Sequence, residues 1–173
     1  GRWVENERKI VYTIPLQDDG KQVRIFLKFV QGYSSRLITR LRKTPRSILL
    51  NAQPVFTTAV LHEGDALCIT LPGEENRAVA LKSDLLPVYE DADVLVFNKP
   101  CHMPVHQSKK HQEDTLSNVF AHYAMENGIM ARFRPINRLD RDTSGLVVVA
   151  KNQFCAGKLN GCVQKEYLAL VQG

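Results

Sequence analysis

The stretch INRLDRDTSGLVVVAKN, residues 136–152, contains the sharpest change of character in this sequence. Two arginines and two aspartates fall within positions 138–142, a glycine follows at position 145, and an uninterrupted apolar run covers 146–150. A short apolar run bounded by turn residues is typical of a strand buried in a sheet. The stretch therefore predicts a charged loop that leads directly into the core of a β-containing domain.

The charged loop is either a solvated turn or a reaction site. On an extended backbone, Asp140 lies on the same side as Arg138 and Asp142, whereas Arg141 faces the other way. An arginine beside a carboxylate at the mouth of a buried strand favours the ionised form, and such a carboxylate suits a nucleophile or a base. The alternative is an Arg–Asp ion pair that only stabilises the loop. These residues alone do not distinguish a reaction site from such a structural pair.

Outward from this loop, hydrophobic periodicity predicts an α+β fold. Apolar residues at helical spacing predict helices in 21–33, 34–43 and 114–128. Gly32 suits the end of the first helix, Ser34 or Ser35 can cap the second, and Asp114 or Thr115 can cap the third, which Gly128 ends. A short helix is predicted in 152–160. Strands are predicted in 8–16, 47–56 (two strands joined by a turn), 62–72, 87–100, 146–150 and 165–171.

The order of these elements predicts two domains. A small αα-hairpin domain precedes the first part of a mixed, mainly antiparallel β-sheet domain with flanking helices. The polar stretch PGEENRAVALKSD separates them and reads as a linker. The predicted boundaries are an N-terminal strand or extension at 1–19, the helix-pair domain at 20–72, the linker at 73–85 and the sheet domain at 86–173.

Composition fits a globular protein and argues against a membrane or secreted one. Of 173 residues, 44% are apolar and 24% are charged, and a chain of this length buries roughly 70% of its unfolded surface. No apolar run approaches the roughly 20 residues that cross a bilayer, and the N-terminus carries no apolar signal core. We therefore expect a cytoplasmic protein whose four cysteines are reduced thiols.

Positive charge is concentrated in the predicted helix pair. The net charge is +5, and eight basic residues but no acidic one lie between Lys21 and His62. Such a one-signed stretch predicts binding to a polyanion; a basic face that only keeps the protein soluble is the alternative. A second basic stretch surrounds Phe133. The candidate RNA contacts are Lys28, Arg36, Arg40, Arg42, Lys43, Arg46, Arg132 and Arg134.

Four segments in order resemble one known family. RLDRDTSG followed by LVVVAKN resembles the signature of RNA pseudouridine synthases of the RluA-like branch. VYEDADVLVFNKPCHMPVH resembles that family's first catalytic-domain motif, and KEYLALVQG resembles its Lys-x-Tyr-x-Ala-x-Val-x-Gly strand. Residues 20–72 resemble the S-four-type RNA-binding domain that often precedes it. The resemblance covers nearly the whole chain from residue 20.

The resemblance implies an isomerase that converts uridine in RNA, expected to be ribosomal RNA, into pseudouridine. By motif position, Asp140 is the catalytic aspartate, which attacks at the sugar or at the base. Arg138 matches the residue that helps displace the target base, and Tyr167 matches the tyrosine that lies against the flipped uracil. A base inside a duplex must be flipped out before it can react, and a cation and an aromatic face suit a flipped base. The family implies a monomer that needs no metal or organic cofactor.

Two departures from the family pattern qualify these expectations. Asn137 stands where the family usually has histidine. The family's later motif, with an arginine that pairs with the catalytic aspartate, has no counterpart here, so we expect a C-terminally truncated chain. The alternative function is therefore a non-catalytic RNA-binding protein, a truncated relative of these enzymes. A zinc site at Cys101, His102, His106 and His111 is disfavoured, because their spacing fits no standard ligand arrangement.

Overall fold

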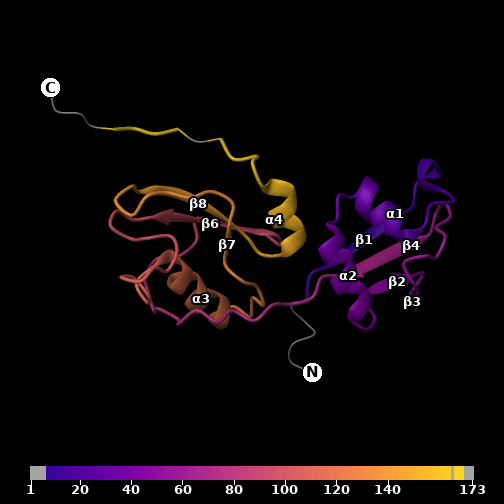
Figure 1. Cartoon of the computed structure of the whole chain (residues 1–173), viewed down its shortest axis with the longest axis horizontal. Helices are drawn as coiled ribbons and strands as arrows, with labels where there is room; N and C mark the ends of the chain where they lie inside the picture. The colour runs from indigo at the N-terminus through magenta and orange to yellow at the C-terminus, as the bar shows by residue number, and fades with distance from the viewer. Residues whose placement is uncertain (1–6, 165, 170–173) are drawn as a thin grey trace.

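A computed structural model of the protein describes residues 7–164 and 166–169. It contains two four-stranded sheets, which lie in separate lobes (Figure 1). We call residues 7–72 the N-terminal lobe and residues 73–164 the C-terminal lobe. Every strand pair is antiparallel, and helices pack beside both sheets. The predicted α+β fold with mainly antiparallel sheets is confirmed.

The sheet of the N-terminal lobe has the order β1-β4-β2-β3. Its strands are β1 (Lys9–Thr13), β2 (Ile48–Leu50), β3 (Gln53–Pro54) and β4 (Ala66–Thr70). Cys68 of β4 lies opposite Val11 of β1 on one side and Leu49 of β2 on the other. The first strand, which the sequence left as a possible extension, is therefore part of this sheet.

Two helical segments cover this sheet. Helix α1 (Val23–Ile25) continues into a π-helical turn, η2 (Phe26–Val30), and α2 (Ser35–Lys43) follows; a short 3₁₀ turn, η1 (Leu16–Asp18), precedes them. The Ser34 hydroxyl accepts a hydrogen bond from the Leu37 backbone nitrogen and caps α2. Gly32 between the helices has φ +79°, a conformation that suits glycine. The predicted helix pair is confirmed.

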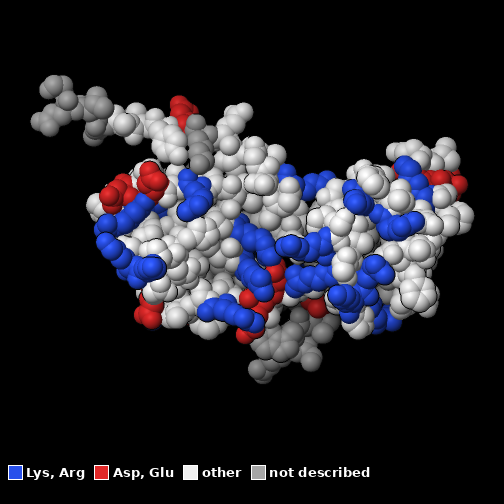
Figure 2. All heavy atoms as spheres, in the orientation of Figure 1, with Lys and Arg blue, Asp and Glu red and all other residues white. Residues whose placement is uncertain are grey.

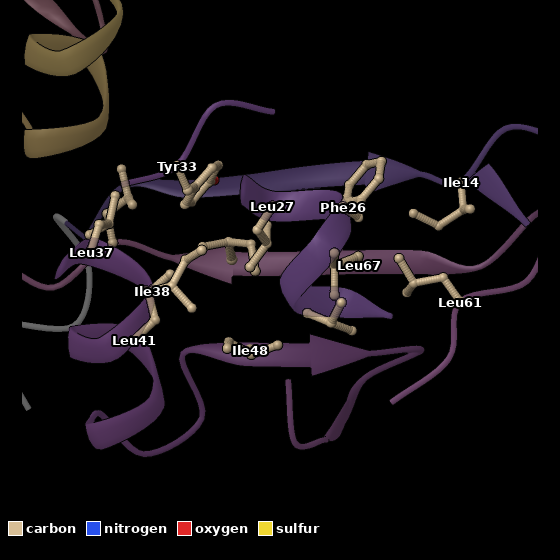
Figure 3. Close-up of a cluster of buried hydrophobic side chains, with 13 residues drawn as sticks. Ile14, Phe26, Leu27, Tyr33, Leu37, Ile38, Leu41, Ile48, Leu61 and Leu67 are labelled. Atoms are coloured by element: carbon tan, nitrogen blue, oxygen red, sulfur yellow. The ribbon is translucent and has the colours of Figure 1, made fainter. Parts of the chain in front are cut away.

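The apolar faces of these elements meet in one core. Phe26 and Leu27 from η2, with Leu37, Ile38 and Leu41 from α2, point onto the sheet (Figure 3). All five are at least 92% buried, and full burial of such a side chain contributes about 1.5–3 kcal/mol. The basic side chains of α2 consequently occupy its outer surface, because the helical period places the apolar residues on one side.

The sheet of the C-terminal lobe has the order β5-β6-β8-β7. Its long central strands are β6 (Val94–Lys99) and β8 (Gly145–Ala150), and its edges are β5 (Tyr89–Glu90) and β7 (Arg134–Pro135). Alternate residues of β6 and β8 are buried against α3 (Leu116–Glu126). The charged loop of 138–144 thus leads into a central strand, as the sequence predicted.

Residues 73–85, predicted as a linker, pack onto the C-terminal lobe. Leu81 and Leu85 contact its core. The buried Asn118 side chain of α3 donates to the Val79 carbonyl oxygen at 2.8 Å, and the Leu81 backbone nitrogen donates to the Asn118 carbonyl oxygen at 3.0 Å. The segment therefore runs along α3 with its own hydrogen bonds, which its polar composition did not predict.

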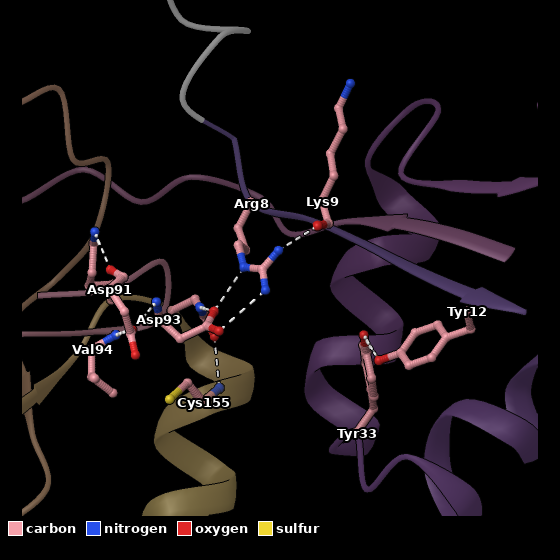
Figure 4. Close-up of polar contacts among 10 residues, drawn as sticks. Arg8, Lys9, Tyr12, Tyr33, Asp91, Asp93, Val94 and Cys155 are labelled. Atoms are coloured by element: carbon pink, nitrogen blue, oxygen red, sulfur yellow. Dashed lines mark hydrogen bonds and ion pairs between the residues drawn. The ribbon is translucent and has the colours of Figure 1, made fainter.

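The two lobes are joined by polar and aromatic contacts. Arg8, just before β1, binds both carboxylate oxygens of Asp93 at 2.9 and 3.3 Å (Figure 4). Phe154 of α4 (Gln153–Leu159) packs on Tyr33 of the N-terminal lobe, with ring centroids 4.3 Å apart. Because the Arg8 hydrogen bond favours the charged carboxylate, the pKa of Asp93 is lowered. Helix α4 therefore bridges the lobes.

The predicted final strand at 165–171 is wrong where the structure describes it. Residues 166–169 form no strand and pair with no strand of the described chain; positions 165, 170 and 171 lie outside the described residues. A strand is stabilised by ladder hydrogen bonds to a neighbour, and alternating apolar residues alone do not supply one. In Figure 1 this segment leads away from α4 and the sheet.

Candidate active site

The side chain of Asn137 fixes the point where the charged loop leaves the sheet. Its amide nitrogen donates to the Leu146 carbonyl oxygen at 2.9 Å, and its amide oxygen accepts from the Val148 backbone nitrogen at 2.8 Å. The side chain is buried and copies the hydrogen bonding of a peptide group beside β8. This position, which departs from the family's usual histidine, therefore carries a structural anchor for the loop.

Lys99 ties the other side of the loop to β6. It ends that strand, is fully buried, and donates hydrogen bonds to the carbonyl oxygens of Met103 at 2.7 Å and of Pro100 and Arg141 at 3.1 Å. Burial lowers the pKa of Lys99, and the nearby acidic groups, among them Asp140, oppose this shift. The loop is therefore held by two buried polar side chains, one from each side.

Asp142 binds the turn that follows β6. Its carboxylate oxygen Oδ1 lies 2.9 Å from His102 Nδ1, and its carbonyl oxygen accepts a hydrogen bond from Cys101 Sγ at 2.9 Å. The hydrogen bond to His102 lowers the pKa of Asp142. Asp142 therefore connects the charged loop to the turn that follows β6.

Asp140 is presented differently from its neighbour. Its carbonyl oxygen accepts from the Thr143 backbone nitrogen at 3.0 Å, which closes a turn, and its side chain is exposed. Arg138 is also exposed on the same loop. The geometry leaves an accessible carboxylate on a backbone that Lys99 and Asn137 hold in place, an arrangement that can bring the carboxylate to a bound substrate without reorganising the loop.

An aromatic cluster lies beside Arg138. The pKa of His106 is lowered, first by burial and then by the positive charge of Arg138. The His106 ring meets Phe133 edge to face at 5.3 Å, and Phe133 packs on Phe120 at 5.5 Å. The guanidinium and this cluster together give the loop a basic and aromatic flank.

Tyr167 has no position in the sheet that carries this site. It lies in the segment that forms no strand, and its side chain is 60% exposed. The role of Tyr167 beside the flipped base therefore stays a prediction from the sequence motif. In the described residues, no strand pairing fixes the position of Tyr167.

Three of the predicted RNA-binding arginines converge on one buried carboxylate. The Glu74 side chain is 5% exposed, and it pairs with Arg134 at 2.7 Å (Nη2 to Oε2), with Arg40 at 3.4 Å and with Arg132 at 3.5 Å. Burial alone would raise the pKa of Glu74, but the Arg134 hydrogen bonds and the other two charges outweigh it, so the pKa is lowered. Arg132 and Arg134 lie in the same lobe as Glu74, and the pair with Arg40 crosses between the lobes. Sequence reasoning missed Glu74 because it stands in a polar stretch without periodicity.

The remaining predicted RNA contacts stay on the surface of the N-terminal lobe. Lys28 lies over the Phe29 ring, with Nζ 5.5 Å from the ring centroid. Arg36 is exposed on the first turn of α2, whereas Arg42, Lys43 and Arg46 follow at its end. Figure 2 shows lysine and arginine side chains gathered over the part of this lobe that carries α2.

The described residues contain neither a cluster of metal-ligating side chains nor a membrane-spanning helix. Within residues 7–164 and 166–169, no three histidine, cysteine, aspartate or glutamate side chains cluster as metal ligands would. The four cysteines are unpaired thiols. No helix in this part of the chain combines the length and apolar character needed to span a bilayer.

Comparison with known proteins links this chain to one family. Residues 93–173 match the family model described as RNA pseudouridylate synthase. Two Bacillus subtilis proteins named uncharacterized RNA pseudouridine synthases are similar: YjbO is 33% identical over 82% of this chain and 53% of its own length, and YlyB is 35% identical over 92% and 56%. The Neisseria meningitidis ribosomal large subunit pseudouridine synthase D is 34% identical over 85% of this chain and 40% of its own. The chain thus spans about half the length of these curated relatives.

Proposed function

We propose that this chain, whose residues 93–173 match the family model described as RNA pseudouridylate synthase, isomerises uridine in RNA with Asp140 as the catalytic carboxylate. One observation carries the proposal. Within the matched residues, the exposed Asp140 stands on a loop that buried Lys99 and Asn137 fix at the ends of β6 and β8. Catalysis by a carboxylate requires such positioning, since a nucleophile held in place loses little entropy at reaction.

The reaction needs only groups that the chain can supply. The bond between uracil N1 and ribose C1′ breaks, the base rotates, and a bond forms between C5 and C1′. The C5 proton is lost and N1 gains a proton, so atoms and electrons balance without an oxidant or a cofactor. Asp140 attacks at the sugar or at the base, and Arg138, two residues earlier, helps to hold the base out of the helix.

The N-terminal lobe is the proposed RNA-binding module. It carries the one-signed basic stretch between Lys21 and His62, and Arg36, Arg42, Lys43 and Arg46 remain on its surface. The resemblance of the sequence of residues 20–72 to an S-four-type RNA-binding domain is a further reason for this proposal. A relative whose name specifies the ribosomal large subunit supports ribosomal RNA as the substrate.

A second candidate is a non-catalytic RNA-binding protein. The placement of Tyr167 favours it, because the tyrosine expected against the flipped base is 60% exposed and lies outside the sheet. A flipped uracil without an aromatic face beside it loses stacking of about 1–3 kcal/mol. Under this candidate the basic surface still binds RNA, but no uridine is converted.

Release of tritium from RNA labelled at uridine C5 distinguishes the two candidates. Pseudouridine formation ejects that hydrogen, so the chain should release tritium to water, and Asp140→Asn should reduce the rate at least 1,000-fold (about 4 kcal/mol of barrier). The matched control is Asp142→Asn, which changes the neighbouring carboxylate in the same loop and should keep most of the activity. Equal rates for the wild type and Asp140→Asn would refute the catalytic assignment. No release by any chain, together with salt-dependent RNA binding, would favour the second candidate.

A further inference from the structure

An open groove lies at the end of α2, far from the charged loop in sequence. Residues 41–48 of α2 and its following turn form one wall, and residues 54–58 after β3 form the other. The groove has a volume of about 600 Å³, a size that suits a single nucleotide or a drug-sized ligand. Among the residues that the structure describes, no aspartate or glutamate lines it.

Three cations line this groove without acidic partners. Arg42, Lys43 and Arg46 make no ion pair within the described part of the chain. Arg40, one turn earlier on α2, differs because it is already paired with Glu74 at 3.4 Å. Unpaired cations in a hollow with no carboxylate attract an anion, since nothing in the groove competes for them.

Phe56 adds an aromatic face to the groove. Its side chain is 86% exposed, although an exposed phenyl ring is unfavourable in water. Two hydrogen bonds hold its backbone: the Phe56 carbonyl oxygen accepts from the Ala59 nitrogen at 3.0 Å, and the carbonyl oxygen of the next residue, buried Thr57, accepts from the Arg24 nitrogen at 2.9 Å. The fold thus presents the ring to solvent on a fixed segment.

Arg46 has an unusual backbone for its residue type. Its φ is +59°, in the left-handed region that favours glycine or asparagine. The adjacent Ser47 is buried and holds the turn through a hydrogen bond from its backbone nitrogen to the Thr44 carbonyl oxygen at 3.3 Å. An arginine kept in a strained conformation at the rim of a cationic groove points to a functional demand on its side chain.

We propose that this groove binds one unpaired nucleotide of RNA, with its base stacked on Phe56 and its phosphates against Arg42, Lys43 and Arg46. The inference rests on the proposed function in that RNA is the polyanion. An aromatic ring can stack only on a base that is out of a duplex, so the groove selects single-stranded loops or ends over paired RNA. The N-terminal lobe then recognises a structural feature of the substrate at a distance from the target uridine.

Fluorescence anisotropy with the whole chain tests this inference. The probes are a labelled RNA hairpin with an unpaired loop and a fully paired duplex of similar length. Phe56→Ala should weaken binding to the hairpin about tenfold, the lower part of the range for one stacked base, and should leave duplex binding within about twofold. Phe56→Trp should restore hairpin affinity, because it keeps an aromatic face. The matched control is Leu16→Ala, which removes another large exposed apolar side chain of this lobe outside the groove and should change neither affinity beyond about twofold.

A charge variant separates failure of this inference from failure of the proposed function. Arg42→Glu with Lys43→Glu should weaken binding to both RNAs and reduce the salt dependence. If this double variant weakens binding but Phe56→Ala binds the hairpin like the wild type, the stacking site is refuted and the RNA-binding module stands. If the double variant also binds both RNAs like the wild type, the proposal that the N-terminal lobe binds RNA is refuted, and so is the stacking site.

Discussion

Replacing Glu74 by glutamine should lower the stability of the chain and weaken one of the contacts between its two lobes. This carboxylate is 95% buried and receives Arg134 at 2.7 Å and Arg40 at 3.4 Å, from the C-terminal and N-terminal lobes respectively. Glutamine has nearly the same volume but no charge. The substitution therefore removes the ion pairs while it leaves the packing around the side chain almost unchanged.

The expected loss of stability depends on how exposed the three arginine partners of Glu74 are. Removing one member of a buried ion pair costs about 3–5 kcal/mol. Solvent reaches part of Arg134, which is 24% exposed, and more of Arg40 and Arg132, at 36% and 62%, and screening reduces the contribution of such charges. Because glutamine can still accept one hydrogen bond from Arg134, we expect the free energy of unfolding to fall by about 2 kcal/mol.

Urea unfolding followed by circular dichroism measures this loss. The matched control is Glu75→Gln, whose side chain is 78% exposed and lies 3.9 Å from Arg77; it should change the free energy of unfolding by less than about 0.5 kcal/mol. Equal stability of the Glu74→Gln and Glu75→Gln variants would refute the reasoning, because it would show that the buried carboxylate contributes no more than a surface one.

The pH dependence gives the same prediction a second readout. The pKa of Glu74 is lowered from its ordinary value of 4.5 in the folded chain. Its contribution is therefore present above pH 4.5 and is lost as the pH falls through the lowered pKa. The difference in the free energy of unfolding between the wild type and Glu74→Gln should be largest near neutral pH and should shrink as the pH falls below 4.5. A difference that grows on acidification would contradict this sign.

Two further substitutions test the supports of the charged loop. Asn137→Ala leaves two backbone groups of β8 without their side-chain partners and should lower the free energy of unfolding by about 2 kcal/mol. Asn137→His should recover part of this stability, because a ring nitrogen can replace one of the two hydrogen bonds. Thermal melts of the wild type and the two variants measure both effects. Lys99→Met leaves three carbonyl oxygens without their donor and should lower the free energy of unfolding by about 3 kcal/mol. It should also reduce tritium release more than RNA affinity. An unchanged melting temperature would show that the Lys99 ammonium does not hold the loop.

Sequence patterns within a single element were sufficient to predict α2 and β8. In α2, the Ser34 cap and the apolar stripe through Leu37 and Leu41 are both signals within one helix, so the sequence alone located it. The strand of β8 was predicted from its apolar run for the same reason. The change of pattern between these elements is also the basis of the predicted domain boundaries, which stay a prediction.

The supports of the site depend on contacts that no local pattern contains. Glu74 meets Arg134 across 60 positions, and Lys99 meets the Arg141 carbonyl oxygen across 42. Asn137 was noted only as a departure from a family pattern, yet its amide copies a peptide group beside β8. The predicted strand at 165–171 was wrong for a related reason, because its alternation does not say which strand would pair with it.

The most direct test of the account is to identify the nucleoside that the chain makes. RNA incubated with the wild type, Asp140→Asn or Asp142→Asn is digested to nucleosides, and pseudouridine is separated from uridine by chromatography and confirmed by its unchanged mass. The account predicts pseudouridine with the wild type and Asp142→Asn, in amounts equal to the tritium released, and none above background with Asp140→Asn. Pseudouridine formed by Asp140→Asn at the wild-type rate would contradict it.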